Sequence, residues 1–343
     1  MIKTDTNILI LLRPDDPSLE KIHALCPRGK VTIGPWLAEK GKLLPADMLH
    51  GVDILFCELP PANFNDFDQL KWIQLTSAGY AQVLGLPICE RGIRVTNGLG
   101  TFDVPIAEWN IMMMLWWHRN MLDAQASQKA RVFDRADKYQ RELRGSTVGF
   151  YGYGGIARET ARMAKALGLN VWALTRGPLT NRSATAFCVE GTGDAEGVLP
   201  DRVFSPADSA EFFGGLDYLI VTVPLTTATR GIIGEKELHM LKPSAVLINC
   251  ARAHVIDESA YVRCLAEKWI RGSALDVHYA YPLPPEHPLW AMPNLIMTAH
   301  ISGSSGGTHF ISRTYSIFTQ NLERYISDHP LLNELTADQL KGK

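Results

Sequence analysis

The sequence predicts an α/β protein with two doubly wound parallel-sheet domains, and three observations lead to this fold class. Short apolar strands alternate with helical segments along most of the chain. The alternation restarts at Thr147 with a glycine-rich turn between a strand and a helix. The length of 343 residues exceeds what one hydrophobic core usually serves, which favours two domains.

The first part of the chain predicts the strands of one parallel sheet. Apolar runs indicate buried strands at residues 7–12, 53–58, 72–75 and 94–97. A long helix is expected over residues 105–123, with Pro105 in its first turn and Asp103 as its N-cap. Because this helix is apolar nearly all round, we expect it at a domain junction or a subunit interface.

The segment 147–176 carries the most informative motif. An apolar run, 147–151, leads into Gly152-Tyr153-Gly154-Gly155-Ile156-Ala157, a helical pattern that Gly168 ends, and a second apolar run at 171–174. This is the context that a dinucleotide-binding fingerprint requires. Gly152 permits a tight turn, and Gly154 lets backbone N–H groups approach a pyrophosphate. A tight strand-to-helix turn without a ligand is the alternative interpretation.

The rest of the chain predicts a second sheet and a closing helix. Strands are expected at 218–223, 245–250, 273–277 and 295–298. The segment 177–209 has no clear period and is interpreted as a long surface excursion. A helix at 308–327 is expected to pack back on the first domain.

Composition excludes several kinds of partner. The formal net charge is −2 and no Lys/Arg block is present, which argues against nucleic acid. No apolar run reaches membrane-spanning length, so we expect no membrane partner. The six cysteines form no C-x-x-C pair, so neither a disulfide framework nor a metal site is predicted. Reduced thiols and a cytoplasmic location are expected.

Three polar side chains follow apolar strands downstream of the fingerprint, where open α/β sheets bind ligands. Arg252 can hold a carboxylate through its planar fork, and Asp276 can accept a hydrogen bond from a carboxamide. His300 can exchange a proton near neutral pH. Each also has a structural interpretation: an ion-paired arginine, a turn cap and a structural histidine.

From about Trp72 to about Gly303 the chain resembles the D-isomer-specific 2-hydroxyacid dehydrogenase family, which includes the NAD-dependent formate dehydrogenases. The resemblance is carried by KWIQLTSAGY (71–80), PIAEW (105–109), VGFYGYGGIA (148–157), VPLTTATRGIIG (223–234), LKPSAVLINCARAHVID (241–257), LDVHYAYPLPPEHPLW (275–290) and TAHISG (298–303). It implies a Rossmann-type cofactor domain, residues 105–298, inserted into a flavodoxin-like substrate domain, residues 1–104 and 299–343. The active site would be the cleft between them.

The same resemblance implies residue roles. Arg252 takes the position of the family's substrate-binding arginine and His300 that of its acid/base histidine. Backbone amides of Ser77, Ala78 and Gly79 would meet the substrate carboxylate, and Asp276 would orient the nicotinamide carboxamide. The expected cofactor contacts are Gly152, Tyr153, Gly154, Gly155, Ile156, Thr175, Arg176, Val223, Pro224, Cys250, Ala251, Arg252, Asp276 and His300. A homodimer built around the first crossover helix is also implied.

Tyr281 is the largest departure from the family pattern. The family usually has a glutamate there, which pairs with the histidine and raises its pKa. A phenol is neutral at pH 7, so Tyr281 would position His300 while leaving it less readily protonated. Formate dehydrogenases have a neutral glutamine there and need no proton transfer. However, this sequence shows no counterpart of their long N-terminal extension or of their formate-binding asparagine.

Cofactor choice is predicted from the end of the second fingerprint strand. An acidic residue about 20 positions beyond the glycines holds the ribose 2′-OH of NAD. Thr175 stands there instead, followed by Arg176, which favours NADP(H) while NAD(H) stays possible. Arg182 could assist if the excursion folds over the adenosine.

The predicted function is reduction of a small 2-keto acid to a D-2-hydroxy acid, or the reverse reaction. Two alternatives stay open. One is an oxidation like that of formate dehydrogenase, which needs no proton relay. The other is a non-catalytic protein that binds and senses the cofactor.

Overall fold

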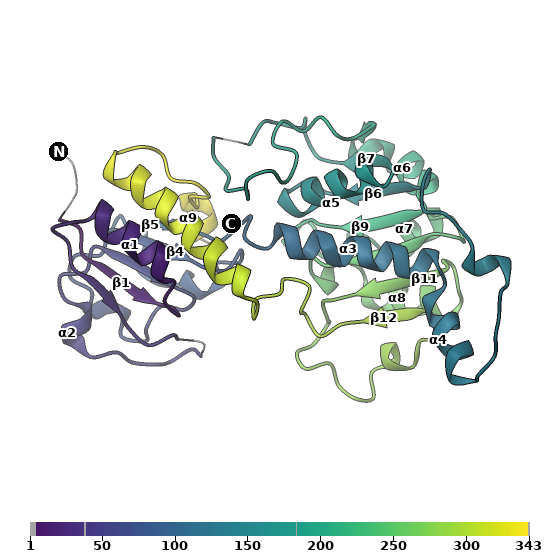
Figure 1. Ribbon diagram of the computed structural model, residues 1–343, viewed down its shortest axis with the longest axis horizontal. Helices are drawn as coiled ribbons and strands as arrows, with labels where there is room; N and C mark the ends of the chain where they lie inside the picture. The colour runs from purple at the N-terminus through teal and green to yellow at the C-terminus, as the bar shows by residue number, and fades with distance from the viewer. Residues whose placement is uncertain (1–4, 38, 183, 342–343) are drawn as a thin grey trace. The chain divides into compact units, whose positions relative to one another are not determined.

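The computed structural model describes residues 5–37, 39–182 and 184–341, and the chain divides into two compact units (Figure 1). Unit 1 comprises Met1–Phe102, Arg182–Val189 and Ser305–Lys343, and unit 2 comprises Asp103–Asn181 and Glu190–Ser304. Residues 1–4, 38, 183, 342 and 343 fall in the predicted domains but lie outside the described residues. Both sheets are entirely parallel, which confirms the predicted fold class. The domain boundaries after residues 104 and 298 stay predictions.

Unit 1 contains a five-stranded sheet in the order β2-β1-β3-β4-β5. The strands are β1 (Ile8–Leu11), β2 (Val31–Ile33), β3 (Ile54–Cys57), β4 (Trp72–Leu75) and β5 (Arg94–Thr96). Alternate β1 residues face opposite sides: Ile8 and Ile10 pack towards α1 (Asp16–Leu25) and α9 (Thr308–Ile326), whereas Leu9 and Leu11 pack towards α2 (Ala46–Leu49). The C-terminal helix therefore packs on the first sheet, as predicted. The sequence did not reveal β2, because its three residues form no buried apolar run.

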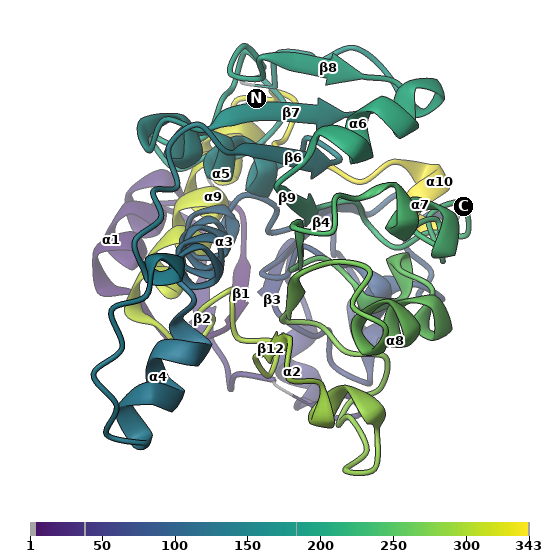
Figure 2. The same cartoon turned by 90° about the vertical axis from the view of Figure 1, so that its right-hand side faces the viewer.

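Unit 2 contains a seven-stranded sheet in the order β12-β11-β10-β9-β6-β7-β8. Figure 2 shows β8, β7, β6 and β9 of this sheet side by side. The strands are β6 (Thr147–Tyr151), β7 (Asn170–Leu174), β8 (Arg202–Phe204), β9 (Tyr218–Val221), β10 (Val246–Asn249), β11 (Gly272–Leu275) and β12 (Leu295–Met297). The chain order reverses between β6 and β9, where doubly wound sheets bind ligands beyond the carboxyl ends of the strands.

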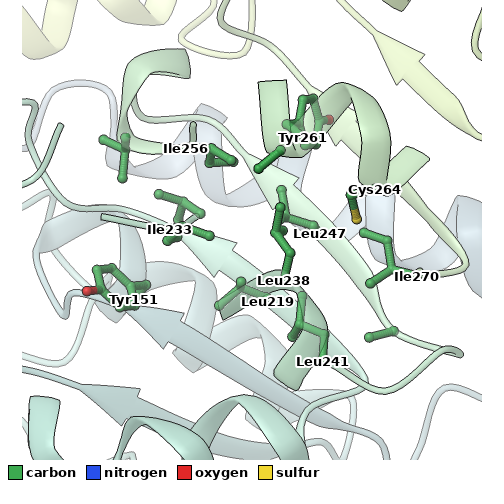
Figure 3. Close-up of a cluster of buried hydrophobic side chains, with 14 of the residues drawn as sticks. Tyr151, Leu219, Ile233, Leu238, Leu241, Leu247, Ile256, Tyr261, Cys264 and Ile270 are labelled. Atoms are coloured by element: carbon green, nitrogen blue, oxygen red, sulfur yellow. The ribbon is translucent and has the colours of Figure 1, made fainter. Parts of the chain in front are cut away.

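Helices supply the apolar layers of unit 2. The core in Figure 3 packs strand residues such as Leu219 and Leu247 against Leu238 of α7 (Glu235–Met240) and Tyr261 of α8 (Glu258–Ala266). The helix α6 (Ser209–Gly215) joins the same layer through Phe212 and Phe213. The helices α3 (Asp103–His118) and α5 (Gly155–Ala166) pack against each other, and α3 also contacts β10.

The helix expected over 105–123 is two helices, so that prediction was wrong in its extent. Asn120 adopts a left-handed conformation, with φ of 48°, and separates α3 from α4 (Met121–Lys129). Asp103 is the first helical residue of α3 rather than its N-cap. Among the described residues, no helix combines the length and apolar character that crossing a membrane requires.

The excursion 177–209 is more ordered than the sequence suggested. It contains β8, and its stretch Arg182–Val189 belongs to unit 1. Phe187 is buried in unit 1 beside Leu332, and Asn333 donates its backbone N–H to Thr185 at 3.0 Å. Most described residues of this stretch are exposed or partly exposed, as a surface excursion implies, but Phe187 anchors it in unit 1, which the sequence did not reveal because a single aromatic side chain in an irregular segment shows no periodicity.

Candidate functional site

The fingerprint turn joins β6 to α5 in unit 2. Gly152 has φ of 93° and donates its N–H to Leu174 at 2.9 Å, which confirms the predicted tight turn. A Cβ on Gly152 would lie 2.7 Å from Val223 Cγ1, so the glycine also permits close approach of the neighbouring loop. The first N–H groups of α5 have no acceptor within the helix and lie at its positive end. The turn thus fits the pyrophosphate of a dinucleotide.

Two further loops line the carboxyl edge near this turn. The Thr222 hydroxyl donates to Gly152 O at 2.8 Å, and the Thr229 hydroxyl donates to Pro224 O at 2.7 Å. These bonds fix the loop that carries the predicted contacts Val223 and Pro224. The Cys250 thiol is buried, and burial raises its pKa to about 12. The thiol therefore stays protonated and packs in the core, as buried structural cysteines do.

The turn after β7 carries the residues predicted to choose the cofactor. Thr175 donates its N–H to Phe204 O at 3.0 Å and its hydroxyl to Gly177 O at 2.6 Å. Among the described residues, none accepts a hydrogen bond from the N–H of Arg176 or Gly177, and none forms an ion pair with the exposed Arg176 side chain. The turn therefore offers positive charge and open donors. Arg182 belongs to unit 1 and not to the unit of this turn.

Arg252 follows β10, and the buried Asn249 fixes the backbone that presents it. Asn249 Oδ1 accepts the N–H of Ala251 at 3.0 Å, and its Nδ2 donates to Arg252 O at 3.1 Å. The Arg252 side chain is exposed, and one guanidinium nitrogen donates to Ala251 O at 2.6 Å. The other guanidinium N–H groups are therefore open to a ligand at the carboxyl end of β10.

Asp276 follows β11 and is fully buried. Its carboxylate accepts the hydroxyl of Thr298 at 2.5 Å, the N–H of Ile301 at 2.9 Å, and both the N–H and the hydroxyl of Ser302, at 3.0 and 2.5 Å. These four bonds satisfy the acceptor capacity of a carboxylate. Asp276 therefore holds the turn that carries His300, which agrees with the turn-capping interpretation.

His300 sits within that turn in a left-handed conformation, with φ of 58°. Such a conformation costs on the order of 1 kcal/mol for a residue with a side chain and is frequent at functional sites. Although part of the ring is exposed, burial lowers its pKa; Arg252 and His278 lower the pKa further, and Asp276 opposes them. Tyr281 is not among the causes of this lowered pKa, so the expectation that Tyr281 leaves His300 less readily protonated stays a prediction.

Tyr281 lies beside His300, with ring centroids 5.4 Å apart and the rings tilted by 44°. Its hydroxyl accepts the backbone N–H of His278 at 3.0 Å. The His278 ring donates from Nε2 to Thr298 O at 2.8 Å and is buried. His278 was missed by sequence reasoning, because nothing in the sequence distinguishes it from a core residue after a strand.

The loop Ser77–Gly79 lies in unit 1, after β4. The carbonyl oxygens of Ser77, Ala78 and Gly79 accept hydrogen bonds from Gly98 N (2.8 Å), Asn97 Nδ2 (2.9 Å) and Ser77 Oγ (2.7 Å), respectively. Among the described residues, none accepts from the three backbone N–H groups. Backbone N–H groups that are open in this way can donate hydrogen bonds to an anion such as a carboxylate.

The structure thus groups the predicted residues by unit. Arg252, Asp276, Tyr281 and His300 meet at the carboxyl ends of β10, β11 and β12, within unit 2. The loop Ser77–Gly79 belongs to unit 1. The cleft that the family resemblance implies stays a prediction.

Comparison with known proteins identifies the family. The family model described as "D-isomer specific 2-hydroxyacid dehydrogenase, NAD binding domain" matches residues 111–302. The chain is 31% identical to a glyoxylate reductase of Thermofilum pendens over 69% of this chain and 66% of that protein. It is 32% identical to a D-3-phosphoglycerate dehydrogenase of Methanocaldococcus jannaschii, over 69% of this chain and 42% of that protein. The chain thus covers less than two thirds of either relative.

A solved structure shows the same fold. An NADPH-dependent glyoxylate/hydroxypyruvate reductase from Sinorhizobium meliloti, in complex with NADP and malonate, superposes with a TM-score of 0.68 at 25% identity, covering 98% of each chain. The chain belongs to the D-isomer-specific 2-hydroxyacid dehydrogenase family.

Proposed function

We propose that this protein is an NADP(H)-preferring oxidoreductase that reduces a small 2-keto acid to a D-2-hydroxy acid, or catalyses the reverse reaction. The observation that carries the proposal is the His300 turn: a strained histidine, locked by the buried Asp276, beside Arg252 at the edge of the fingerprint sheet. Strain and buried charge at one strand edge are the features of a catalytic centre.

The side chains take the following roles. Arg252 holds the substrate carboxylate and polarises the carbonyl, because its guanidinium can bind two oxygens at once. His300 donates a proton to the substrate oxygen during reduction and accepts one during oxidation, while Tyr281 limits how its ring can lie. The open amides of Ser77, Ala78 and Gly79 contribute further donors to the carboxylate. When bound, the nicotinamide supplies the hydride that reaches substrate C2.

The fit of the cofactor rests on three loops of unit 2. The fingerprint turn would hold the pyrophosphate, and Asp276 would orient the nicotinamide carboxamide in exchange for one of its four present donors. The exposed Arg176 and the open N–H groups of Arg176 and Gly177 meet the 2′-phosphate. The S. meliloti reductase, NADPH-dependent by description and bound to NADP, supports this preference.

A spectrophotometric assay tests the proposal directly. Glyoxylate, hydroxypyruvate, pyruvate and phenylpyruvate are offered with NADPH and, separately, with NADH. We expect oxidation of NADPH with at least one of them, and loss of this activity in His300→Ala and in Arg252→Met. Measurable binding of cofactor without turnover of any keto acid would refute the reductase and favour the non-catalytic alternative.

A second candidate function is an oxidation that needs no proton relay, like that of formate dehydrogenase. It is favoured by Tyr281, which places a neutral group where the family has a glutamate. The two candidates differ in the role of His300: full loss of turnover in His300→Ala supports proton transfer, whereas retained oxidation of formate would support the second candidate.

We further propose a homodimer formed through α3. An apolar groove on this helix is lined by Ile111, Met112, Leu115 and Trp116, together with Met163 of α5. The adjoining α4 has no buried residue, and Phe133 beyond it is 92% exposed. A second copy of this chain would cover these surfaces, since exposed apolar patches of this kind mark protein interfaces.

A further inference from the structure

A buried polar cluster adjoins the fingerprint turn of unit 2. We call Tyr153, Arg158, Glu159 and Asp194 the anchor cluster. The exposed fractions are 7% for Tyr153, 4% for Arg158, 1% for Glu159 and 7% for Asp194. Buried charges are costly unless they are paired and hydrogen-bonded, and three of these four residues have no role in the proposed reaction.

Arg158, in the first turn of α5, binds two parts of the excursion: the outgoing arm, residues 175–180, and the returning arm, residues 194–199. Its guanidinium donates to Thr180 O at 2.9 Å on the outgoing arm, and to Ala195 O at 3.0 Å and Asp194 O on the returning arm. It also lies over the Tyr153 ring, 5.3 Å from the centroid. Arg158 donates to the two arms from two nitrogens, Nη1 to the returning arm and Nη2 to the outgoing arm, a spacing that the single nitrogen of lysine does not reproduce.

Asp194 closes the returning arm. Its carboxylate accepts the N–H groups of Gly197, Val198 and Leu199 at 3.0 to 3.2 Å. It also accepts the hydroxyl of Tyr153 at 2.8 Å, and burial together with Asp194 raises the pKa of Tyr153, so the phenol stays a donor. The returning arm is therefore bonded to the residue between the first two fingerprint glycines.

The outgoing arm, which follows β7, is therefore held by hydrogen bonds at both of its ends. At one point Thr175 bonds to Phe204 and Gly177, and at the other Arg158 bonds to Thr180. Arg176 lies between them, exposed and without an ion pair among the described residues. Fixing both ends of this short arm reduces the conformational entropy that binding a ligand there would cost.

We propose that Arg158 and Asp194 are positioning residues for cofactor choice: Arg158 holds the arm 175–180 through Thr180, and Asp194 fixes the returning arm that Arg158 also binds, so that Arg176 meets the 2′-phosphate of NADP(H). This inference rests on the proposed preference for NADP(H). Neither residue touches the cofactor. Their loss frees the arm that faces the 2′-phosphate, a group that NADH lacks, while the pyrophosphate contacts at α5 are common to both cofactors.

Fluorescence titrations with NADPH and with NADH test the inference on Arg158→Lys and Asp194→Asn. We expect the dissociation constant for NADPH to rise about tenfold in each variant, while that for NADH stays close to the wild-type value. The matched controls are Arg263→Lys and Asp208→Asn. They make the same chemical changes at exposed positions of unit 2, where Arg263 pairs with Glu235 and Asp208 bonds to Ser205, and they should leave both constants unchanged.

The outcomes separate the inference from the proposed function. A wild-type protein that binds NADPH no more tightly than NADH refutes both. A wild-type preference that survives in Arg158→Lys and Asp194→Asn, or equal weakening of both cofactors, overturns the inference alone. If either variant fails to fold, Tyr153→Phe is used instead, because it removes only the hydroxyl that bonds to Asp194. A rise in the ratio of the NADPH to the NADH dissociation constant would support the inference, and an unchanged ratio would overturn it.

Discussion

Replacing Tyr281 by glutamate would show how this protein sets the protonation of its histidine. At present the Tyr281 hydroxyl accepts a backbone N–H, and no charge faces the imidazole from this position. Burial holds the pKa of His300 below its ordinary value; Arg252 and His278 act in the same direction, and Asp276 acts against them. A carboxylate at position 281 would favour the imidazolium, so we expect the pKa of His300 to rise.

The size of the rise follows from the spacing of the two rings, whose centroids are 5.4 Å apart. A unit charge at that distance contributes about 0.8 kcal/mol at the dielectric constant of water and about 3 kcal/mol at an effective value near 20. These energies correspond to about 0.6 and about 2.3 pKa units. Because the Tyr281 side chain is 59% exposed, screening places the result near the lower value, at roughly one unit.

The sign of the pH effect follows from the role of His300 in reduction. In the proposed reduction the imidazolium would be the proton donor, so reductive turnover should be present below the pKa of His300 and be lost as pH rises through it. In the wild type this falling limb should lie below the ordinary histidine value, because the pKa is lowered. In Tyr281→Glu the limb should move to higher pH by roughly one unit.

The assay is kcat/KM for keto-acid reduction by NADPH, measured from about pH 5 to about pH 9, the range in which histidine titrates. Tyr281→Gln is the matched control, since glutamine has the size of glutamate without its charge, and its limb should stay at the wild-type position. An unmoved limb in Tyr281→Glu, or an equal shift in both variants, would show that charge at position 281 does not control His300.

Three further changes test other parts of the structure. Asp276→Asn replaces one acceptor oxygen of the buried carboxylate by an NH2 group, so some of its four donors lose their partner. Urea denaturation should show a loss of about 3 kcal/mol in unfolding free energy, and unchanged stability would contradict the structural role of Asp276. Gly155→Ala would place a methyl 1.9 Å from Asp103 Oδ2 and should cost about 1–3 kcal/mol, which Asp103→Ala should largely restore in a thermal melt. Met112→Glu charges the groove on α3, so light scattering should report monomers; a persisting dimer would place the interface elsewhere.

The fold was predictable where burial is periodic. Strands such as β4 and β6 were located to the residue, because most residues of each are apolar and buried and the polarity of the chain changes at their ends. The same logic placed Arg252, Asp276 and His300, since residues one to three positions after a parallel strand lie at the carboxyl edge of the sheet, where such sheets bind ligands. Helix ends were harder: Asn120 breaks α3 from α4, although the apolar pattern around it continues.

The anchor cluster could not be predicted, because it forms from polar residues that lie far apart in the sequence and meet only in the folded chain. In the sequence Arg158 is indistinguishable from an ordinary surface residue of a helix. Its partner Asp194 lies in a segment that has no hydrophobic periodicity, so nothing in the sequence connects the two. Hydrogen bonds to backbone carbonyls depend on where the chain passes and not on residue type, so no residue pattern signals them. Phe187, in the same excursion, lacked a signal for the same reason.

Asp276 links what the sequence predicted to what the structure adds. Its carboxylate already accepts four hydrogen bonds, so a nicotinamide carboxamide can bind only if one donor leaves. The N–H groups of Ile301 and Ser302 cannot turn away without moving the backbone beside His300, whereas the Thr298 hydroxyl can rotate. The carboxamide would therefore replace a hydroxyl and leave the backbone bonds intact. One buried carboxylate could then orient the cofactor and hold the turn of the proposed catalytic histidine, and Asp276→Asn, which keeps the position but removes an acceptor oxygen, would disturb both.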